Sequence, residues 1–230
     1  MKVIGLIGGM SWESTATYYR LINEGVKSRL GGHHSAKLVL YSMDFAEVET
    51  LQQLGRWKEA GEMMASAARS LERAGAQFIV LCTNTMHEVA AAIEAAVAIP
   101  LLHIADPTAE AVKAAGLTSI GLMGTRFTME RPFYIERLRR HGLSVVVPEL
   151  DDRNTTHRII FDELVHGRIE NESRAAYLQI IERLQHGGAQ GVILGCTEIS
   201  LLISPGMIKN PSFDTTELHA YAAVALALSE

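Results

Sequence analysis

Two short segments place a side chain that could transfer protons directly after an apolar run. In residues 192–198, Val-Ile-Leu-Gly-Cys-Thr-Glu, Cys196 follows a glycine and precedes a hydroxyl residue and an acid. In residues 78–85, Phe-Ile-Val-Leu-Cys-Thr-Asn-Thr, Cys82 and Thr83 follow the apolar run. A thiol has an ordinary pKa of about 8.5, and a helix start favours its thiolate form. Cys196 precedes a predicted helix, so its thiol is expected to be shifted toward thiolate.

The two segments follow one design, and the residues before them set their alignment. Gly75-Ala76-Gln77 leads into the first segment, and Gly188-Ala189-Gln190 leads into the second. This alignment places Thr83 opposite Cys196 and leaves Cys82 opposite a glycine. Adjacent strand residues point to opposite faces of a sheet, so Cys82 and Thr83 should not serve interchangeably. We predict that the Thr83 hydroxyl and the Cys196 thiol face one site, and that Cys82 is a core residue.

A longer repeat supports this alignment. Residues 119–125, Ser-Ile-Gly-Leu-Met-Gly-Thr, repeat residues 3–9, Val-Ile-Gly-Leu-Ile-Gly-Gly. The offset from Ile4 to Ile120 is 116 residues, close to the 113 residues from Thr83 to Cys196. A duplicated α/β unit explains both offsets. We predict a first α/β lobe of residues 1–105 plus 206–230 and a second lobe of residues 106–205.

The predicted elements alternate between strands and helices. Strands are expected at residues 3–7, 36–41, 78–81, 99–104, 119–123, 143–147, 191–194 and 212–214. Helices are expected from about residue 11 to 30 and at residues 44–54, 57–74, 86–97, 107–115, 131–141, 151–166, 173–186, 199–203 and 216–228. This alternation indicates parallel sheets flanked by helices, in which ligands bind beyond the carboxyl ends of strands. Four segments with candidate chemical residues lie at such ends: residues 8–11, 83–85, 124–125 and 196–198.

Composition argues against several classes of partner and location. The net charge is −5 and no run of Lys or Arg stands out, so neither nucleic acid nor an anionic membrane is an expected partner. No apolar run approaches the ~18 residues of a membrane span, and the N-terminus is typical of a first strand rather than a signal peptide. Two cysteines make no disulfide framework, which favours a cytoplasmic protein.

The sequence also lacks the usual marks of a bound cofactor. Gly5, Gly8 and Gly9 do not have the spacing of a dinucleotide fingerprint, and no P-loop occurs. The nine histidines form no metal-binding pattern, so we expect neither a metal nor another cofactor. We interpret His87 as a structural residue at a helix start, and the pair at residues 33–34 as an exposed turn.

Three motifs together resemble the aspartate/glutamate racemase superfamily of cofactor-independent amino-acid racemases. They are residues 5–10, Gly-Leu-Ile-Gly-Gly-Met; residues 84–87, Asn-Thr-Met-His; and residues 195–198, Gly-Cys-Thr-Glu. The chain looks most like enterobacterial members described as L-aspartate/glutamate-specific or broad-specificity racemases. The resemblance implies two pseudo-symmetric α/β lobes with the active site between them, an amino-acid substrate and a homodimer.

The chain departs from this family at two places. The usual first-lobe motif is Cys-Asn-Thr, whereas residues 83–85 are Thr-Asn-Thr. Members tuned to aspartate carry an Arg and a Lys for the side-chain carboxylate, but residues 44–46 and 165–166 offer no clear cationic equivalent. The preferred amino acid therefore stays open, and Gln52 becomes the expected polar contact.

The implied reaction removes the Cα proton on one face and returns a proton on the other, with Cys196 as base and Thr83 as opposing donor. The expected substrate-binding residues are Met10, Ser11, Gln52, Asn84, Thr85, Thr125, Thr197 and Glu198. Helix-start N–H groups among them could hold the substrate carboxylate. Two alternatives remain. One is a related decarboxylase or cis–trans isomerase of a small diacid, and the other is a small-molecule binding protein with little turnover.

Overall fold

A computed structural model describes residues 1–229, which divide into two compact units. The first unit combines Met1–Ile104 with the chain from His219 onward, and the second is Ala105–Leu218. This division differs from the predicted lobes over residues 206–218, which lie in the second unit. The reason is that the last strand, β8 (Ser212–Asp214), pairs with β7 (Val192–Gly195).

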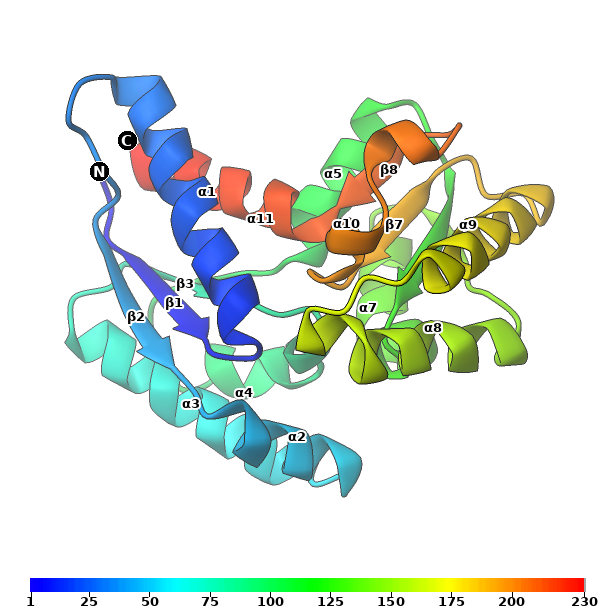
Figure 1. The fold of residues 1–230 in the computed structure, drawn as a ribbon. Coiled ribbons are helices and arrows are strands. Elements are labelled where there is room, and N and C mark those ends of the chain that lie inside the picture. The colour runs from blue at the N-terminus through cyan, green and yellow to red at the C-terminus, as the bar shows by residue number, and fades with distance from the viewer. Residues whose placement is uncertain (230) are drawn as a thin grey trace. The chain divides into compact units, whose positions relative to one another are not determined.

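The first unit contains a four-stranded parallel sheet (Figure 1). Its strands are β1 (Ile4–Gly8), β2 (Leu38–Ser42), β3 (Phe78–Leu81) and β4 (Leu101–Leu102), in the order β2-β1-β3-β4. Because β1 and β3 are the two central strands, their carboxyl ends lie next to each other. The turns after them are two of the predicted chemical segments.

The second unit repeats this arrangement. Its strands are β5 (Ser119–Gly124), β6 (Ser144–Val146), β7 and β8, in the order β6-β5-β7-β8, and all pairs are parallel. The central strands are now β5 and β7, and the turns after them are the other two predicted segments. The α/β fold with two parallel sheets of matching topology is therefore confirmed.

Helices cover both faces of the first sheet. One face carries Leu6, Val80 and Cys82 against α1 (Trp12–Leu30) and the part of α11 (Thr215–Leu228) that belongs to this unit. The other face packs on α2 (Phe45–Gln53), α3 (Trp57–Arg73), η1 (Thr85–Val89) and α4 (Ala90–Glu94). Figure 1 shows the sheet between α1 and α3. Cys82 is fully buried in the α1–α11 core, as predicted.

In the second unit, α8 (Leu150–Asp162) and α9 (Asn171–His186) cover the face that carries Met123 and Leu194. The remaining helices are α5 (Ala105–Ala114), α6 (Arg126–Glu130), α7 (Pro132–Arg140), η2 (Leu164–His166), α10 (Ile199–Leu202) and η3 (Pro205–Met207). None of the helices described in residues 1–229 is both long and apolar enough to cross a membrane.

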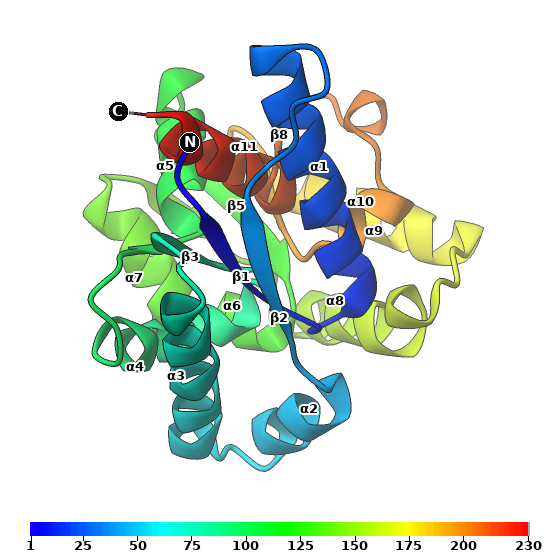
Figure 2. The same ribbon diagram turned by 90° about the vertical axis from the view of Figure 1, so that its left-hand side faces the viewer.

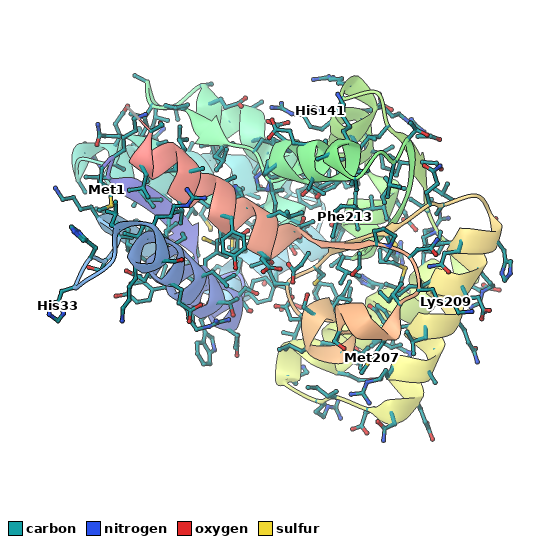
Figure 3. The ribbon with its side chains drawn as sticks, turned by 90° about the horizontal axis from the view of Figure 1, so that it is seen from above. Met1, His33, His141, Met207, Lys209 and Phe213 are labelled. Atoms are coloured by element: carbon teal, nitrogen blue, oxygen red, sulfur yellow. The ribbon has the colours of Figure 1, made fainter. Side chains whose placement is uncertain are left out.

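Several predicted elements differ in detail from the structure. The sequence predicted a helix at residues 131–141 and missed α6, which ends just before it. Arg131 separates α6 from α7 in an extended conformation, because the residue before a proline is disfavoured in the helical region. The helix predicted over residues 86–97 is shorter and begins with a 3-10 segment. His33 and its neighbour are exposed in the turn after α1, as predicted (Figure 3).

Close backbone approaches explain the glycines at the ends of the central strands. A Cβ on Gly8 would lie 2.4 Å from Thr15 Cγ2, and Gly9 has a φ of 89°. In the second unit, Gly124 pairs with Gly195, and a Cβ on Gly195 would lie 2.8 Å from the Met123 carbonyl oxygen. Glycine therefore lets each chain turn sharply just before a polar segment.

Candidate active site

The turn after β1 is held by the N-terminus of α1. Ser11 is the N-cap, and its Oγ accepts a hydrogen bond from the Ser14 backbone N–H at 3.3 Å. The Gly9 N–H donates to Thr15 Oγ1 at 2.7 Å. The Met10–Ser11 peptide bond is cis, and both residues are buried. Ser11 is thus fixed at the start of α1, shortly after the end of β1.

The turn after β3 contains Thr83, Asn84 and Thr85, all of which are buried. The Thr83 N–H donates to the Leu81 carbonyl at 2.8 Å, which turns the chain out of the strand. No hydrogen bond is made by Thr83 Oγ1 within residues 1–229. The hydroxyl is therefore oriented by the backbone that carries it and not by a polar neighbour.

Gln52 lies close to this turn. It is buried on α2, and its Nε2 lies 3.0 Å from Met86 Sδ, one residue beyond Thr85. Met10 and Met86 belong to the same apolar cluster. The first unit therefore gathers its predicted site residues around the ends of β1 and β3. The Gln52 amide, however, is already engaged with a methionine.

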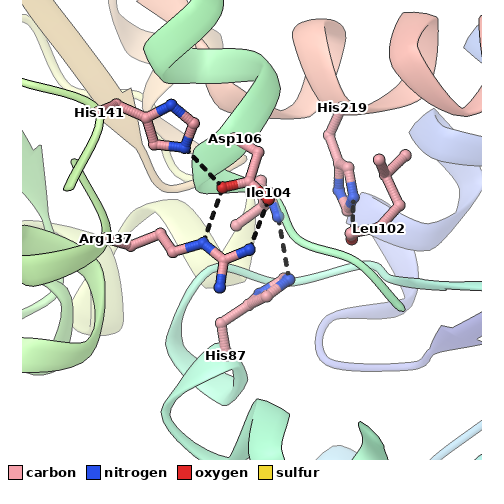
Figure 4. Close-up of polar contacts among 7 residues, drawn as sticks. All are labelled: His87, Leu102, Ile104, Asp106, Arg137, His141 and His219. Carbon is pink, nitrogen blue, oxygen red and sulfur yellow. Dashed lines mark hydrogen bonds and ion pairs between the residues drawn. The ribbon is translucent and has the colours of Figure 1, made fainter. Parts of the chain in front are cut away.

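His87 supports the Thr83 turn from behind. Its Nδ1 lies 2.8 Å from the Thr83 carbonyl oxygen. Its Nε2 lies 3.2 Å from the Ile104 backbone nitrogen, a contact that Figure 4 shows. A carbonyl can only accept and an N–H can only donate, so Nδ1 carries the proton and Nε2 does not. Burial, followed by the neighbouring His103 and His219, lowers the pKa of His87 well below its ordinary value.

His219 makes a matching set of bonds in the same unit. Its Nε2 donates to the Leu102 carbonyl at 2.9 Å, and its Nδ1 is hydrogen-bonded to the Tyr18 hydroxyl at 2.9 Å. The ring centroid of His87 lies 4.5 Å from that of His103 and 5.9 Å from that of His219. Three buried imidazoles therefore support the first unit beneath the Thr83 turn. The sequence pattern gave no sign of this cluster, since its members are distant along the chain.

The turn after β5 has the same design as the turn after β1. Thr125 is the N-cap of α6, and its Oγ1 accepts from the Thr128 backbone N–H at 3.3 Å. Thr125 is buried, as Ser11 is. A hydroxyl cap thus follows the first central strand in both units.

The turn after β7 contains a thiol and a carboxylate in direct contact. Cys196 Sγ donates to Glu198 Oε2 at 3.0 Å, and Thr197 Oγ1 donates to the same oxygen at 2.6 Å. Glu198 is buried and Cys196 is partly buried. This turn is therefore acidic, whereas the Thr83 turn is supported by the neutral imidazole of His87.

The expected shift of Cys196 toward thiolate is wrong for this arrangement. Burial, followed by the charge and hydrogen bond of Glu198, raises the pKa of Cys196 well above its ordinary value. Asp214 adds to this rise from the start of α11. The helix after Cys196 is the single turn Ile199–Leu202, and a carboxylate already lies at its start. The resting thiol is therefore protonated.

Asp214 is a further acidic residue that the sequence analysis did not select. It ends β8, accepts hydrogen bonds from the Thr216 and Glu217 N–H groups at 2.8 and 3.2 Å, and also bonds to Ser200. Its position after a short apolar strand was a usable signal. The structure thus groups Asp214 with the acidic turn of the second unit. The meeting of Thr83 and Cys196 in one site stays a prediction.

Comparison with known proteins identifies the family to which the chain belongs. Residues 7–223 match the family described as Asp/Glu/Hydantoin racemase. The chain is 54% identical to a candidate Asp/Glu racemase of known structure from Yersinia pestis, with a TM-score of 0.94 and full coverage of both chains. It is 36% identical to an aspartate racemase homologue from Pyrococcus horikoshii, with a TM-score of 0.87 and full coverage of both.

A characterised relative is more distant in sequence. The broad-specificity amino-acid racemase RacX of Bacillus subtilis is 21% identical over 99% of both chains. The family resemblance identified from the three sequence motifs is confirmed. The chain is an amino-acid racemase and belongs to the Asp/Glu/Hydantoin racemase family.

Proposed function

We propose that the protein racemises a free amino acid, aspartate, glutamate or a broader set, without a cofactor, by moving the Cα proton between opposite faces. The observation that supports this most is the asymmetry of the two equivalent strand ends. The β7 end carries a thiol bonded to a carboxylate, and the β3 end carries a hydroxyl. Racemisation needs one proton-transferring group on each side of a planar intermediate.

Cys196 acts as the base in this proposal. Its proton first moves from Sγ to Glu198 Oε2, to which it is already hydrogen-bonded. The thiolate then takes the Cα proton, and the electron pair of the C–H bond passes into the substrate carboxylate as an enediolate-like state. Glu198 thereby gains a role as proton acceptor for the thiol, beyond the substrate contact expected from sequence.

Thr83 returns a proton on the opposite face. Its hydroxyl donates to Cα and is restored by a proton from solvent. An alcohol is a much weaker acid than a thiol, so this side is the slower one. The two directions of racemisation must have equal kcat/KM, because the equilibrium constant between enantiomers is one. The asymmetry therefore appears in kcat and KM taken separately.

The substrate carboxylate is held by hydrogen-bond donors at the strand ends. We assign this role to the backbone N–H groups near Met10, Ser11, Thr85 and Thr197, with Asn84 and Thr125 as further polar contacts. Donors placed where negative charge develops stabilise the intermediate strongly. This placement replaces the electron sink that a cofactor would supply.

The proposed specificity for the substrate side chain rests on the charge and polarity of two residues of the first unit. Asp44 caps α2 by accepting from the Ala46 N–H at 3.1 Å, so this segment presents an acid rather than a cation. Gln52 is the polar residue that the first unit offers nearby. These features favour a broad amino-acid range over strict recognition of a second carboxylate, in line with the broad-specificity relative.

We also propose that the protein is a homodimer of the cytoplasm, where the Cys196 thiol stays reduced. The dimer surface that the fold offers is β2, which lies at the near side of the first unit in Figure 2. It has five residues, whereas the other edge strands have two or three. Its Leu40 and Tyr41 are 43% and 40% exposed. Long uncharged edges of this kind readily pair with another chain.

A second copy of the chain fits this edge, because antiparallel pairing of β2 with itself, centred on Leu40, would continue the sheet of the first unit into that copy. Light scattering should therefore give twice the chain mass, and Leu40→Lys should give a single chain. A monomeric protein at micromolar concentration, or an unchanged dimer in the variant, would contradict this surface.

Incubation with single amino-acid enantiomers in D2O tests the function. Deuterium should appear at Cα and the opposite enantiomer should accumulate, as measured by mass spectrometry and chiral chromatography. A panel of the common amino acids then ranks the side chains. Saturable binding without α-deuterium would instead identify a binding protein, and loss of a carboxyl group would identify a decarboxylase.

A further inference from the structure

The backbone of Thr83 is fixed on both sides of its Cα atom. Its N–H bonds to the Leu81 carbonyl at 2.8 Å, and its own carbonyl accepts from His87 Nδ1 at 2.8 Å. Thr83 is β-branched, so its χ1 angle has few rotamers once the backbone is set. Since Thr83 Oγ1 has no hydrogen bond within residues 1–229, these two backbone bonds determine where the hydroxyl points.

We propose that His87 is a positioning residue for the Thr83 side of the reaction. Its Nδ1–H holds the Thr83 carbonyl and thereby aims the hydroxyl at the point where the Cα proton is returned. The proposal rests on the proposed function, because it needs Thr83 to deliver that proton. His87 itself touches no reacting atom.

The second hydrogen bond of His87 connects the Thr83 turn to the segment at which the chain leaves the first unit. Nε2 accepts from the N–H of Ile104, the last residue before the chain leaves the first unit. His219, where the chain returns, donates to Leu102 in the same segment. Of these two histidines, it is His87 that connects this segment to the Thr83 turn.

The role requires a neutral imidazole. A proton on Nε2 would place an N–H group against the Ile104 N–H, and the charge would lie beside His103 and His219. Tyr18 completes this surrounding through its bond to His219. Burial and these neighbours lower the pKa of His87, which keeps the ring in the form that can hold Thr83.

Two substitutions separate the bonds of His87. In His87→Asn the amide nitrogen takes roughly the place of Nδ1, so the donor to Thr83 is kept and the contact with Ile104 is lost. In His87→Gln the amide oxygen reaches the place of Nε2 and can accept from the Ile104 N–H, so the Ile104 contact is kept and the Thr83 donor is lost. His219→Gln is the matched control, because it alters a buried imidazole of the same cluster that does not touch Thr83.

The measurement is the ratio of inversion to α-deuterium incorporation in D2O, starting from the enantiomer whose proton faces Cys196. His87→Gln should lower this ratio about 10- to 100-fold, since small misplacements of a reacting group cost this much. His87→Asn should keep most of it, and His219→Gln should leave it unchanged at equal folded fraction. Urea unfolding of each variant supplies that fraction.

Equal ratios in the two His87 variants would overturn the positioning role while leaving racemisation intact. A wild-type protein that exchanges no α-proton would overturn both the role and the proposed function. An independent readout is the 15N spectrum of the histidine rings, which should show His87 protonated at Nδ1 and unprotonated at Nε2. The reverse tautomer would also overturn the proposal.

Discussion

The ends of β3 and β7 occupy the same place in two copies of one topology, yet their surroundings are opposite in character. At the β3 end, Thr83 is backed by a neutral His87 that bonds to its carbonyl. At the β7 end, Cys196 is bonded through its side chain to Glu198, and Asp214 adds further negative charge. One turn is controlled through its backbone, and the other through its side chain.

This difference shows how a duplicated fold can support unequal chemistry. The strand order and the glycine-assisted turns are shared, so both units present a residue at the same kind of position. The neighbours then decide what that residue does. In the proposed reaction, the Cys196 thiol loses its proton to the carboxylate beside it, whereas the Thr83 hydroxyl, which has no bonded acceptor in the part of the chain that the structure describes, is the donor.

Removal of the thiol should have the largest effect on this comparison. Cys196→Ser should lower both racemisation and α-deuterium incorporation on the order of 10³-fold, because serine is a far weaker base at neutral pH. Initial rates with the best substrate measure this loss. Cys82→Ala is the matched control for loss of a thiol, and an active Cys196→Ser protein would show that another group is the base.

Glu198→Gln should make the Cys196 thiol more reactive toward alkylation and at the same time make the enzyme slower. Glu198 raises the pKa of Cys196, so Glu198→Gln should lower that pKa and move the midpoint of iodoacetamide alkylation to lower pH. At the same time it removes the proton acceptor, and turnover should fall about 10- to 100-fold. Slower alkylation in the variant would contradict the role of Glu198.

Making the two ends alike should have a smaller effect. Thr83→Cys places a thiol at both strand ends, so inversion should rise about 10-fold relative to deuterium incorporation in the starting enantiomer. The rise should be larger in kcat for the slower direction. A folded variant with an unchanged ratio would show that Thr83 does not limit proton return.

The smallest effect is expected one residue before Thr83. Cys82 is fully buried in the core between β3 and α1, and burial raises the pKa of its thiol. Cys82→Ala should cost about 1 kcal/mol of unfolding free energy and leave turnover essentially intact. Urea titration and initial rates test both parts. A loss of turnover equal to that of Cys196→Ser would mean that the alignment of the repeats is wrong.

The fold and the placement of the chemical turns could be predicted because both depend on local sequence. Short apolar runs define the central strands; a glycine ends β1, β5 and β7, Cys82 follows β3, and a helix follows each strand. The internal repeat then identified Thr83 and Cys196 as equivalent positions. The cap formed by Ser11 was also predictable, since serine before a helix is a frequent N-cap.

The electrostatics of the site could not be predicted in the same way. The pKa of Cys196 depends on burial and on the orientation of Glu198, which adjacency along the chain does not determine. Tyr18 and His219 are 201 residues apart and meet only in the folded first unit. The missed boundary near residue 218 has the same origin, because strand pairing rather than composition assigns β8 to the second sheet.

The first unit is built from both ends of the chain, and this has a consequence for the order of folding. The Lys2 N–H bonds to the Ala227 carbonyl at 2.7 Å, and α11 supplies Ala220, Ala223 and Val224 to the core around β1. During synthesis, residues 105–218 are complete before this helix emerges. We expect the first unit to complete its folding last, because its core includes a helix made more than a hundred residues after the Thr83 turn.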